Sequence, residues 1–141
     1  MYSLAFWLAA ALPAIVVHAP HADLTLEVAR TDAQREYGLM NRTQLAPHTG
    51  MIFVFGGDAP VAFWMKNTLV PLDMVFIAAD GTVRRVFANV AVVPRSLPDA
   101  EIPRESGVAM YVIELPAGEA ARDGIAAGVR LDLHSAGAAG G

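Results

Sequence analysis

A chain of 141 residues has room for one domain and one hydrophobic core. Its formal net charge is −4 and charged residues make up 17% of it, so we do not expect it to bind nucleic acid through its phosphates. The absence of cysteine excludes a disulfide framework, a thiolate metal site and a lipidated cysteine anchor.

The amino-terminal segment is apolar from Leu4 to Val17, and no charged residue precedes Asp23. This run is shorter than the roughly 20 residues of a spanning helix but suits the apolar centre of a secretory signal. We therefore predict a signal peptide over residues 1–22 and a periplasmic or secreted protein with no stable membrane span once it is removed. An uncleaved anchor or a misplaced start is the alternative, because the segment lacks Lys and Arg.

The first part of the expected domain contains two strands and a short helix. Residues 24–29 alternate between apolar and polar side chains, which is typical of a half-buried strand. Thr31 and Gln34 have the spacing of a capping box, and Gly38 is placed to end the helix that they begin. Residues 50–55 are apolar on both faces, as in a central strand.

Further short strands and turns are expected along the rest of the chain. They are a turn at 56–58, a short strand at 63–65, a polar corner at 66–68, a buried strand at 72–77, a hairpin turn at Asp80-Gly81, a return strand at 83–93, a structureless loop at 94–107, a strand at 108–115, a short helix within 117–128, a strand at 129–134 and a disordered tail at 135–141.

These elements predict one mainly β domain over residues 23–134. We expect an antiparallel sandwich or small open barrel with one or two short helices. No alternation of strand, helix and strand is predicted that would favour a parallel sheet.

The stretch from Phe63 to Ile77 has the most informative pattern. It places Lys66, Asn67 and Thr68 within one of the most apolar segments of the expected domain, and Asp73 lies in the same segment. Because a polar group buried without partners costs several kcal/mol, these side chains must pair with one another or be held for a ligand.

Several stretches together resemble domain-of-unknown-function family 192. They are Glu27-Val28-Ala29, Gly38-Leu39-Met40-Asn41-Arg42, Gly50 to Phe55, Phe63 to Ile77 and Tyr111 to Leu115 followed by Ala117-Gly118. The resemblance covers nearly all of the expected domain in the same order. It implies a compact β-rich, sandwich-like domain and implies no activity.

A ligand-binding or accessory module is the first functional interpretation. Ligand sites are mostly apolar with a few convergent polar groups, and Trp64 would supply a stacking face. The candidate ligand-binding residues, which we expect to lie under the 94–107 loop, are Trp64, Lys66, Asn67, Thr68, Asp73, Arg42 and Glu114. A small anionic or sugar-like molecule is the expected ligand; protein partners cannot be named.

Structural and catalytic roles are the alternatives. Lys66 and Asp73 could form an ion pair that fixes a corner of the sheet, and Arg42 could pair with a carboxylate such as Glu114. A small hydrolase or transferase could use Asp73 and Thr68, but no serine elbow, His-Glu metal motif or phosphate loop supports it. An interaction domain would expose Phe63 and Trp64.

The methionines offer a metal interpretation that the sequence does not favour. Thioethers with His48 could bind Cu(I), but they are spread through predicted strands and suit an irregular core. These methionines are Met40, Met51, Met65, Met74 and Met110. We expect no metal site and no cofactor.

Overall fold

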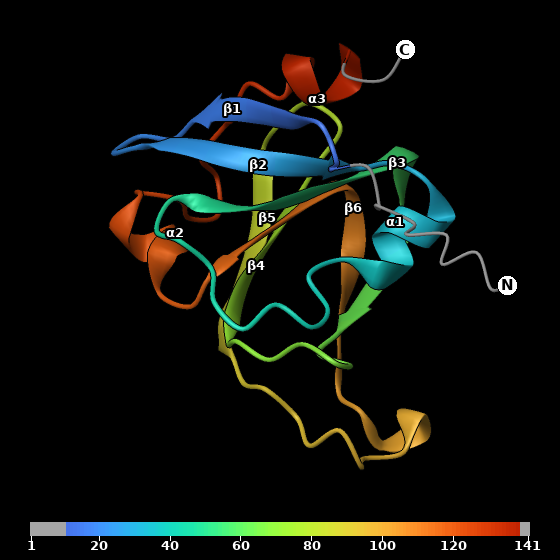
Figure 1. Ribbon diagram of the computed structural model, residues 1–141. Coiled ribbons are helices and arrows are strands. Elements are labelled where there is room, and N and C mark those ends of the chain that lie inside the picture. The colour runs from blue at the N-terminus through green and yellow to red at the C-terminus, as the bar shows by residue number, and fades with distance from the viewer. Residues whose placement is uncertain (1–10, 139–141) are drawn as a thin grey trace, which may run out of the picture.

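The computed structural model describes residues 11–138 and contains one open six-stranded sheet (Figure 1). The strands are β1 (Ala14–His18), β2 (Asp23–Ala29), β3 (Thr49–Trp64), β4 (Leu72–Ile77), β5 (Val83–Val90) and β6 (Arg104–Pro116). Their order across the sheet is β1-β2-β3-β6-β4-β5. The mainly β class expected from the sequence is confirmed.

Three short helices and one 3-10 turn complete the described fold. They are α1 (Asp32–Tyr37), α2 (Glu119–Arg122), α3 (His134–Ala138) and the 3-10 turn η1 (Asp99–Glu101). Thr31 and Gln34 form the expected capping box at the start of α1. Gly38 ends this helix with a φ of 51°, a conformation that favours glycine.

The sheet is mixed, because β2 and β3 pair in parallel. No parallel pairing was expected from the sequence. Parallel neighbours need a long crossover, and here the chain makes it through α1 and the loop that follows. The helix was anticipated but its role as a crossover was not, because α1 has no buried residue and therefore no strong apolar periodicity.

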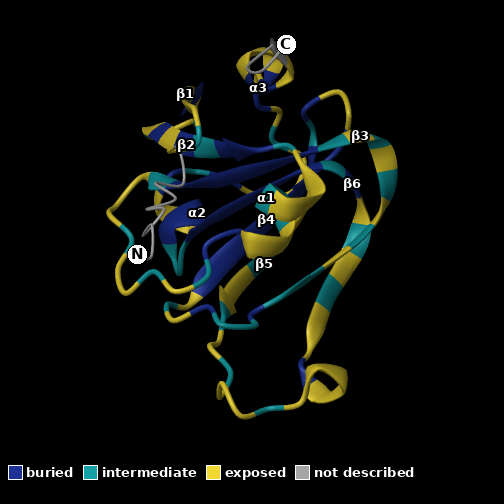
Figure 2. Ribbon diagram, turned by 45° about the vertical axis from the view of Figure 1, so that its right-hand side comes forward, coloured by how far each residue is buried: buried dark blue, intermediate teal, exposed yellow. Residues whose placement is uncertain are grey.

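The turn expected at residues 56–58 is wrong. This segment lies inside β3, where the pairing with β6 shifts register between Val54 and Ala59. Such an irregularity bends a strand without ending it. Beyond it, the distal part of β3 pairs with residues 104–109 of β6 and carries many exposed or half-buried residues (Figure 2).

Apolar side chains pack on both faces of the sheet. One face carries Ile52, Val75, Ile113 and Leu115 and is covered by Ile125, Leu131, Leu133 and Ala136. The other face carries Met51, Phe53, Met74, Phe76 and Val112, together with Leu39 and Met65. β4 is buried along its whole length, as expected for residues 72–77.

The carboxy-terminal expectations need two corrections. Residues 129–134 form no strand; their only ladder contact is an isolated bridge between Thr82 and Arg130. The expected disordered tail begins with α3, whose Ala136 is fully buried. A short helix with few apolar residues gives no clear sequence pattern, and its burial depends on the sheet beneath it. Residues 139–141 lie outside the described part of the chain.

The loop expected at residues 94–107 is more ordered than the sequence indicated. Asp99–Glu101 form η1, and residues 104–107 belong to β6. Ile102 is buried and provides an apolar anchor between them. Figure 1 shows this connection extending away from β1 at the far end of the molecule.

The predicted boundary at residue 22 cuts through the folded unit. Ala14–His18 form β1, which pairs with β2 along its whole length, and Val17 is buried. Residues 1–10 lie outside the described part of the chain, so a leader there stays a prediction. No helix among residues 11–138 is long and apolar enough to cross a membrane.

Removing β1 should therefore destabilise the domain. We expect a chain starting at Asp23 to unfold at a much lower temperature than one starting at Ala11, because it loses a strand and the buried Val17. It should also aggregate, since the edge of β2 becomes unpaired. Thermal unfolding and size-exclusion chromatography of the two truncations measure both effects. Equal melting temperatures would show that β1 is dispensable.

Candidate functional site

Asp73 is a scaffold residue. Its carboxylate is fully buried and accepts hydrogen bonds from three backbone amides, those of Asn89 at 2.8 Å, Gly118 at 3.0 Å and Ala120 at 2.9 Å. The three donors come from the end of β5 and the start of α2. A carboxylate satisfied in this way binds segments of its own chain and is not available to a ligand.

Lys66 does not pair with Asp73, as one interpretation proposed. Its ammonium nitrogen lies 2.8 Å from Asp99 Oδ2 in η1, and it also lies over the ring of Trp64. The ion pair is partly exposed and joins the corner before β4 to the 91–103 connection. The sequence did not indicate this partner, because Asp99 is 33 residues from Lys66 and approaches it only in the folded chain.

Asn67 contributes chiefly through its backbone. It has a φ of 52°, a left-handed conformation that asparagine tolerates better than most residues. Asn41 has a φ of 65°, and its backbone N–H donates to the backbone carbonyl of Asn67 at 2.9 Å. The two asparagine turns therefore hold the segment after α1 against the segment before β4.

Arg42 pairs with a carboxylate, but the partner is Glu27 and not Glu114. Two guanidinium nitrogens of Arg42 donate to the two oxygens of Glu27, one of them at 3.0 Å. This fork-to-fork contact raises the pKa of Arg42. Both side chains are partly exposed, and they connect β2 to the loop after α1.

Glu114 is the buried acid left without a partner. It is 6% exposed, and its side chain makes no hydrogen bond or ion pair with any other described residue. Its neighbours across the sheet are Met51 and Met74. Because this environment solvates a charge poorly, burial raises the pKa of Glu114 to about 8, so the carboxyl is mostly protonated at neutral pH.

Glu114 lines a cleft of about 380 Å³, which we call the α1–β3 cleft. One wall is residues 35–40, from α1 and its end, and the other is residues 60–64 of β3. Phe53 and Phe55 add aromatic surface, and Lys66, Thr68 and Glu114 supply polar groups. The cleft thus combines apolar and polar surface in similar amounts, and it could hold a small molecule that has both an apolar and a polar part.

Of the other predicted site residues, Thr68 and Trp64 also line this cleft. Thr68 is buried and its hydroxyl donates to the Lys66 carbonyl at 3.2 Å, which leaves its oxygen able to accept. Trp64 lies between two cations, 5.2 Å from Lys66 Nζ and 4.5 Å from the guanidinium of Arg104. The predicted set therefore divides, with Trp64, Lys66, Thr68 and Glu114 at the cleft and Asp73 and Arg42 making structural contacts.

The rings of Phe63 and Trp64 do not form an exposed docking surface. Both residues are half-buried. Phe63 packs edge-on against Phe53, with ring centres 4.9 Å apart, and also against Phe55 and Phe76. An interaction domain was expected to expose these two rings to solvent, and they are exposed only in part.

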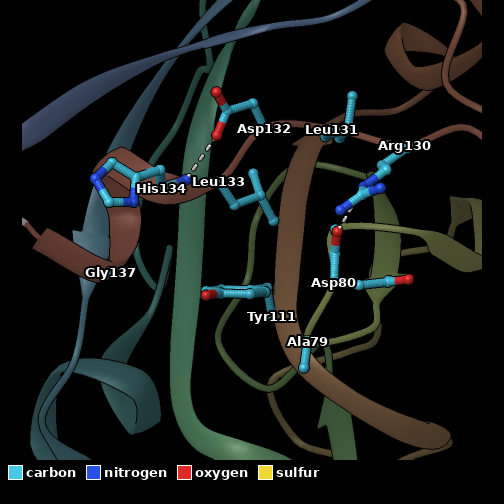
Figure 3. Close-up of a pocket in the computed structure, with 10 residues that line it drawn as sticks. Ala79, Asp80, Tyr111, Arg130, Leu131, Asp132, Leu133, His134 and Gly137 are labelled. Atoms are coloured by element: carbon cyan, nitrogen blue, oxygen red, sulfur yellow. Dashed lines mark hydrogen bonds between the residues drawn. The ribbon is translucent and has the colours of Figure 1, made fainter.

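A larger hollow of about 860 Å³ lies elsewhere, around Tyr111 and residues 130–134 (Figure 3). Its charged residues bond to nearby backbone: Arg130 Nε donates to the Asp80 carbonyl at 2.9 Å, and Asp132 accepts from the His134 amide at 3.0 Å. It contains no buried acid without a partner. We therefore regard the α1–β3 cleft as the better candidate.

His48, Glu119 and Asp123 form a cluster that the sequence analysis missed. Their potential ligand atoms lie within 4.8 Å of one another. Glu119 accepts from the His48 amide and from Arg122 Nε, and the His48 ring pairs with Asp123, which raises the pKa of His48. Two buried carboxylates thus face two basic side chains, and a metal would have to displace the His48–Asp123 contact. No sequence motif signals this cluster, because His48 is 71 residues away from Glu119 in the sequence.

The fold and cleft define a small mixed β-sheet domain with a cleft between a crossover helix and a bent strand. The sequence model of domain-of-unknown-function family 192, described as "Uncharacterized ACR", matches residues 15–133, and the chain belongs to this family. The match begins inside β1, which agrees with the place of this strand in the sheet.

Two solved structures are similar to this chain. A protein from Sinorhizobium meliloti 1021, described as a "putative transcription regulator", is 43% identical with a TM-score of 0.75, and the match covers 86% of this chain and 95% of that one. A protein of unknown function from Novosphingobium aromaticivorans is 32% identical with a TM-score of 0.69, covering 84% and 83%. No curated protein matches the chain.

The structural role of Asp73 predicts a loss of stability in Asp73→Asn. The amide can still accept from two backbone N–H groups, but its NH2 group would face the third donor. We expect the free energy of unfolding to fall by about 2 kcal/mol. Urea denaturation measures it, with Asp99→Asn as an exposed control. A stability loss no larger than that of the control would contradict the scaffold role.

The buried Glu114 predicts a specific pH dependence of stability. Its pKa is about 8 in the folded state, above the usual 4.5, so the folded chain binds the extra proton between these pH values. Stability is then lost as pH rises through this range. Glu114→Gln removes the effect, so the variant should match the wild type near pH 4 and exceed it above pH 8.

At about 1.4 kcal/mol for each pKa unit, the difference between Glu114→Gln and the wild type reaches at most about 5 kcal/mol. Urea denaturation of both proteins between pH 4 and pH 9 measures it. Glu36→Gln, which removes an exposed acid from the rim of the same cleft, is the matched control. A difference that does not change with pH would show that Glu114 ionises normally.

Proposed function

We propose that this protein is an extracytoplasmic binding or accessory module that holds a small molecule in the α1–β3 cleft. The observation that carries the proposal is Glu114, a buried acid with no partner among the described residues, lining a cleft with aromatic walls. Because a carboxyl held against methionines and aromatic rings is poorly solvated, a ligand that pairs with it would recover part of that cost.

A hydrolase or transferase using Asp73 and Thr68 has less support. The oxygens of Asp73 accept from backbone amides, and the Thr68 hydroxyl donates to the Lys66 carbonyl. A general base must lie within hydrogen-bond reach of the nucleophile's proton, and here each group is engaged elsewhere. The proposal is therefore a binding function.

A regulatory function on DNA is not part of this proposal, although one similar structure is described as a "putative transcription regulator". The net charge of −4 would repel phosphates.

The extracytoplasmic location rests on the apolar amino-terminal run. Residues 14–17 of this run also belong to β1, and the paired truncations starting at Ala11 and Asp23 test whether the folded domain needs them.

Filling the cleft tests the proposed function. Met40→Trp places a large ring in the cleft, whereas Met110→Trp puts the same ring against the opposite face of the sheet. In an NMR screen of small apolar compounds with one polar group, shift changes should concentrate at cleft residues. They should disappear in Met40→Trp and persist in Met110→Trp. Shift changes centred on the Tyr111 hollow, or none at millimolar concentration, would refute the proposal.

A further inference from the structure

The two cations of the α1–β3 cleft are already paired. Arg35 donates to Asp32 and to the carbonyls of Arg30 and Val54, the last at 2.9 Å. The Lys66 ammonium lies 2.8 Å from Asp99. A ligand anion would therefore have to displace an existing ion pair, and the anionic or sugar-like ligand expected from the sequence assumed that Lys66 was free.

The two acids of the cleft, unlike its two cations, have no partner of opposite charge among the described residues. Neither Glu36 nor Glu114 forms an ion pair with another residue in the described part of the chain. Glu36 is exposed on α1 and is well solvated by water, whereas Glu114 is buried and meets the cleft with only a small part of its surface. The group most in need of a partner is thus a carboxyl, and a charged partner for it must be a cation.

Thr68 and the cleft walls limit what that cation can be. The Thr68 oxygen can accept one further hydrogen bond and lines the same cleft as Glu114, which suits an N–H donor. Phe55, Val61 and Phe63 are half-buried and present apolar surface to the cleft, so a small hydrated metal ion would leave most of the cleft without contacts. A molecule with an ammonium group and an apolar chain would fit both the polar groups Glu114 and Thr68 and the apolar walls.

We propose that the α1–β3 cleft binds a primary or secondary amine, with its ammonium group paired to the Glu114 carboxylate and donating to Thr68, and its apolar part against Phe55, Val61 and Phe63. This inference rests on the proposed binding function and names the ligand class. On binding at neutral pH, the carboxyl of Glu114 loses its proton to the buffer while the amine keeps its own, so one proton is released for each ligand bound.

Other ionisable groups also face the cleft, and their proton release must be distinguished from that of Glu114. They are Arg35, Glu36 and Tyr37 of α1 and Lys66 with its partner Asp99. The strands that flank Glu114 contribute Met51 and Met74, which do not titrate. Arg35 pairs with Asp32 and Lys66 pairs with Asp99. Proton release that is lost in Glu114→Gln and kept in Glu36→Gln therefore identifies Glu114 as its source.

The test compares hexylamine, hexanoate and hexanol, which share one apolar chain. Isothermal titration calorimetry of the full chain at pH 7, in two buffers with different ionisation enthalpies, gives both affinity and protons released. We expect hexylamine to bind most tightly and to release close to one proton. Glu114→Gln should weaken hexylamine about thirtyfold or more and abolish proton release. The control Glu36→Gln should change affinity less than about threefold, because that acid is exposed.

The outcomes separate the two proposals. Hexanoate or hexanol bound in the cleft more tightly than hexylamine would overturn the amine assignment and leave the binding function standing. Hexylamine bound without proton release by the wild type would also overturn it, whether or not Glu114→Gln folds. If none of the three compounds perturbs the cleft, the binding function itself fails.

Discussion

The buried carboxylate of Asp73 is the contact on which the central part of the structure depends. It lies on β4 and accepts three backbone amides, from Asn89 at the end of β5 and from Gly118 and Ala120 at the start of α2. Elements separated by up to 47 residues thereby share one acceptor group. Because a charged acceptor strengthens each bond and leaving it unsatisfied is costly, this contact fixes where β4 begins and where the chain leaves β6.

Asp73 and Glu114 show how sheet geometry gives two carboxyls opposite roles. Glu114 pairs across the ladder with Met74, so it lies on the same face as that methionine, and Asp73, one residue earlier, faces the other side. On its face Asp73 meets three donors; on the other, Glu114 meets methionines and the open α1–β3 cleft. The protein satisfies one acid completely and leaves the other to a proton or a ligand.

The cleft itself results from a crossover and a bend. α1 carries the chain between the parallel strands β2 and β3 and ends at Gly38, beside Phe53. The irregularity between Val54 and Ala59 then bends β3, so that its distal part forms the opposite wall. Neither feature creates a cleft alone, since a straight β3 would continue along the sheet. Gly50 permits the close approach of β6: a Cβ there would lie 1.9 Å from the Glu114 carbonyl oxygen.

Local patterns in the sequence determined the capping box of Thr31 and Gln34, the end of α1 at Gly38 and the buried strand at residues 72–77, because each depends on neighbours a few residues apart. The family followed from several such stretches in a fixed order along the chain. The tertiary structure alone decided the partners: Lys66 with Asp99, Arg42 with Glu27 and Asp73 with backbone amides. Each partner comes from a distant segment, and charge complementarity in a sequence cannot choose among several candidates until the fold has set which of them lie within a few ångströms.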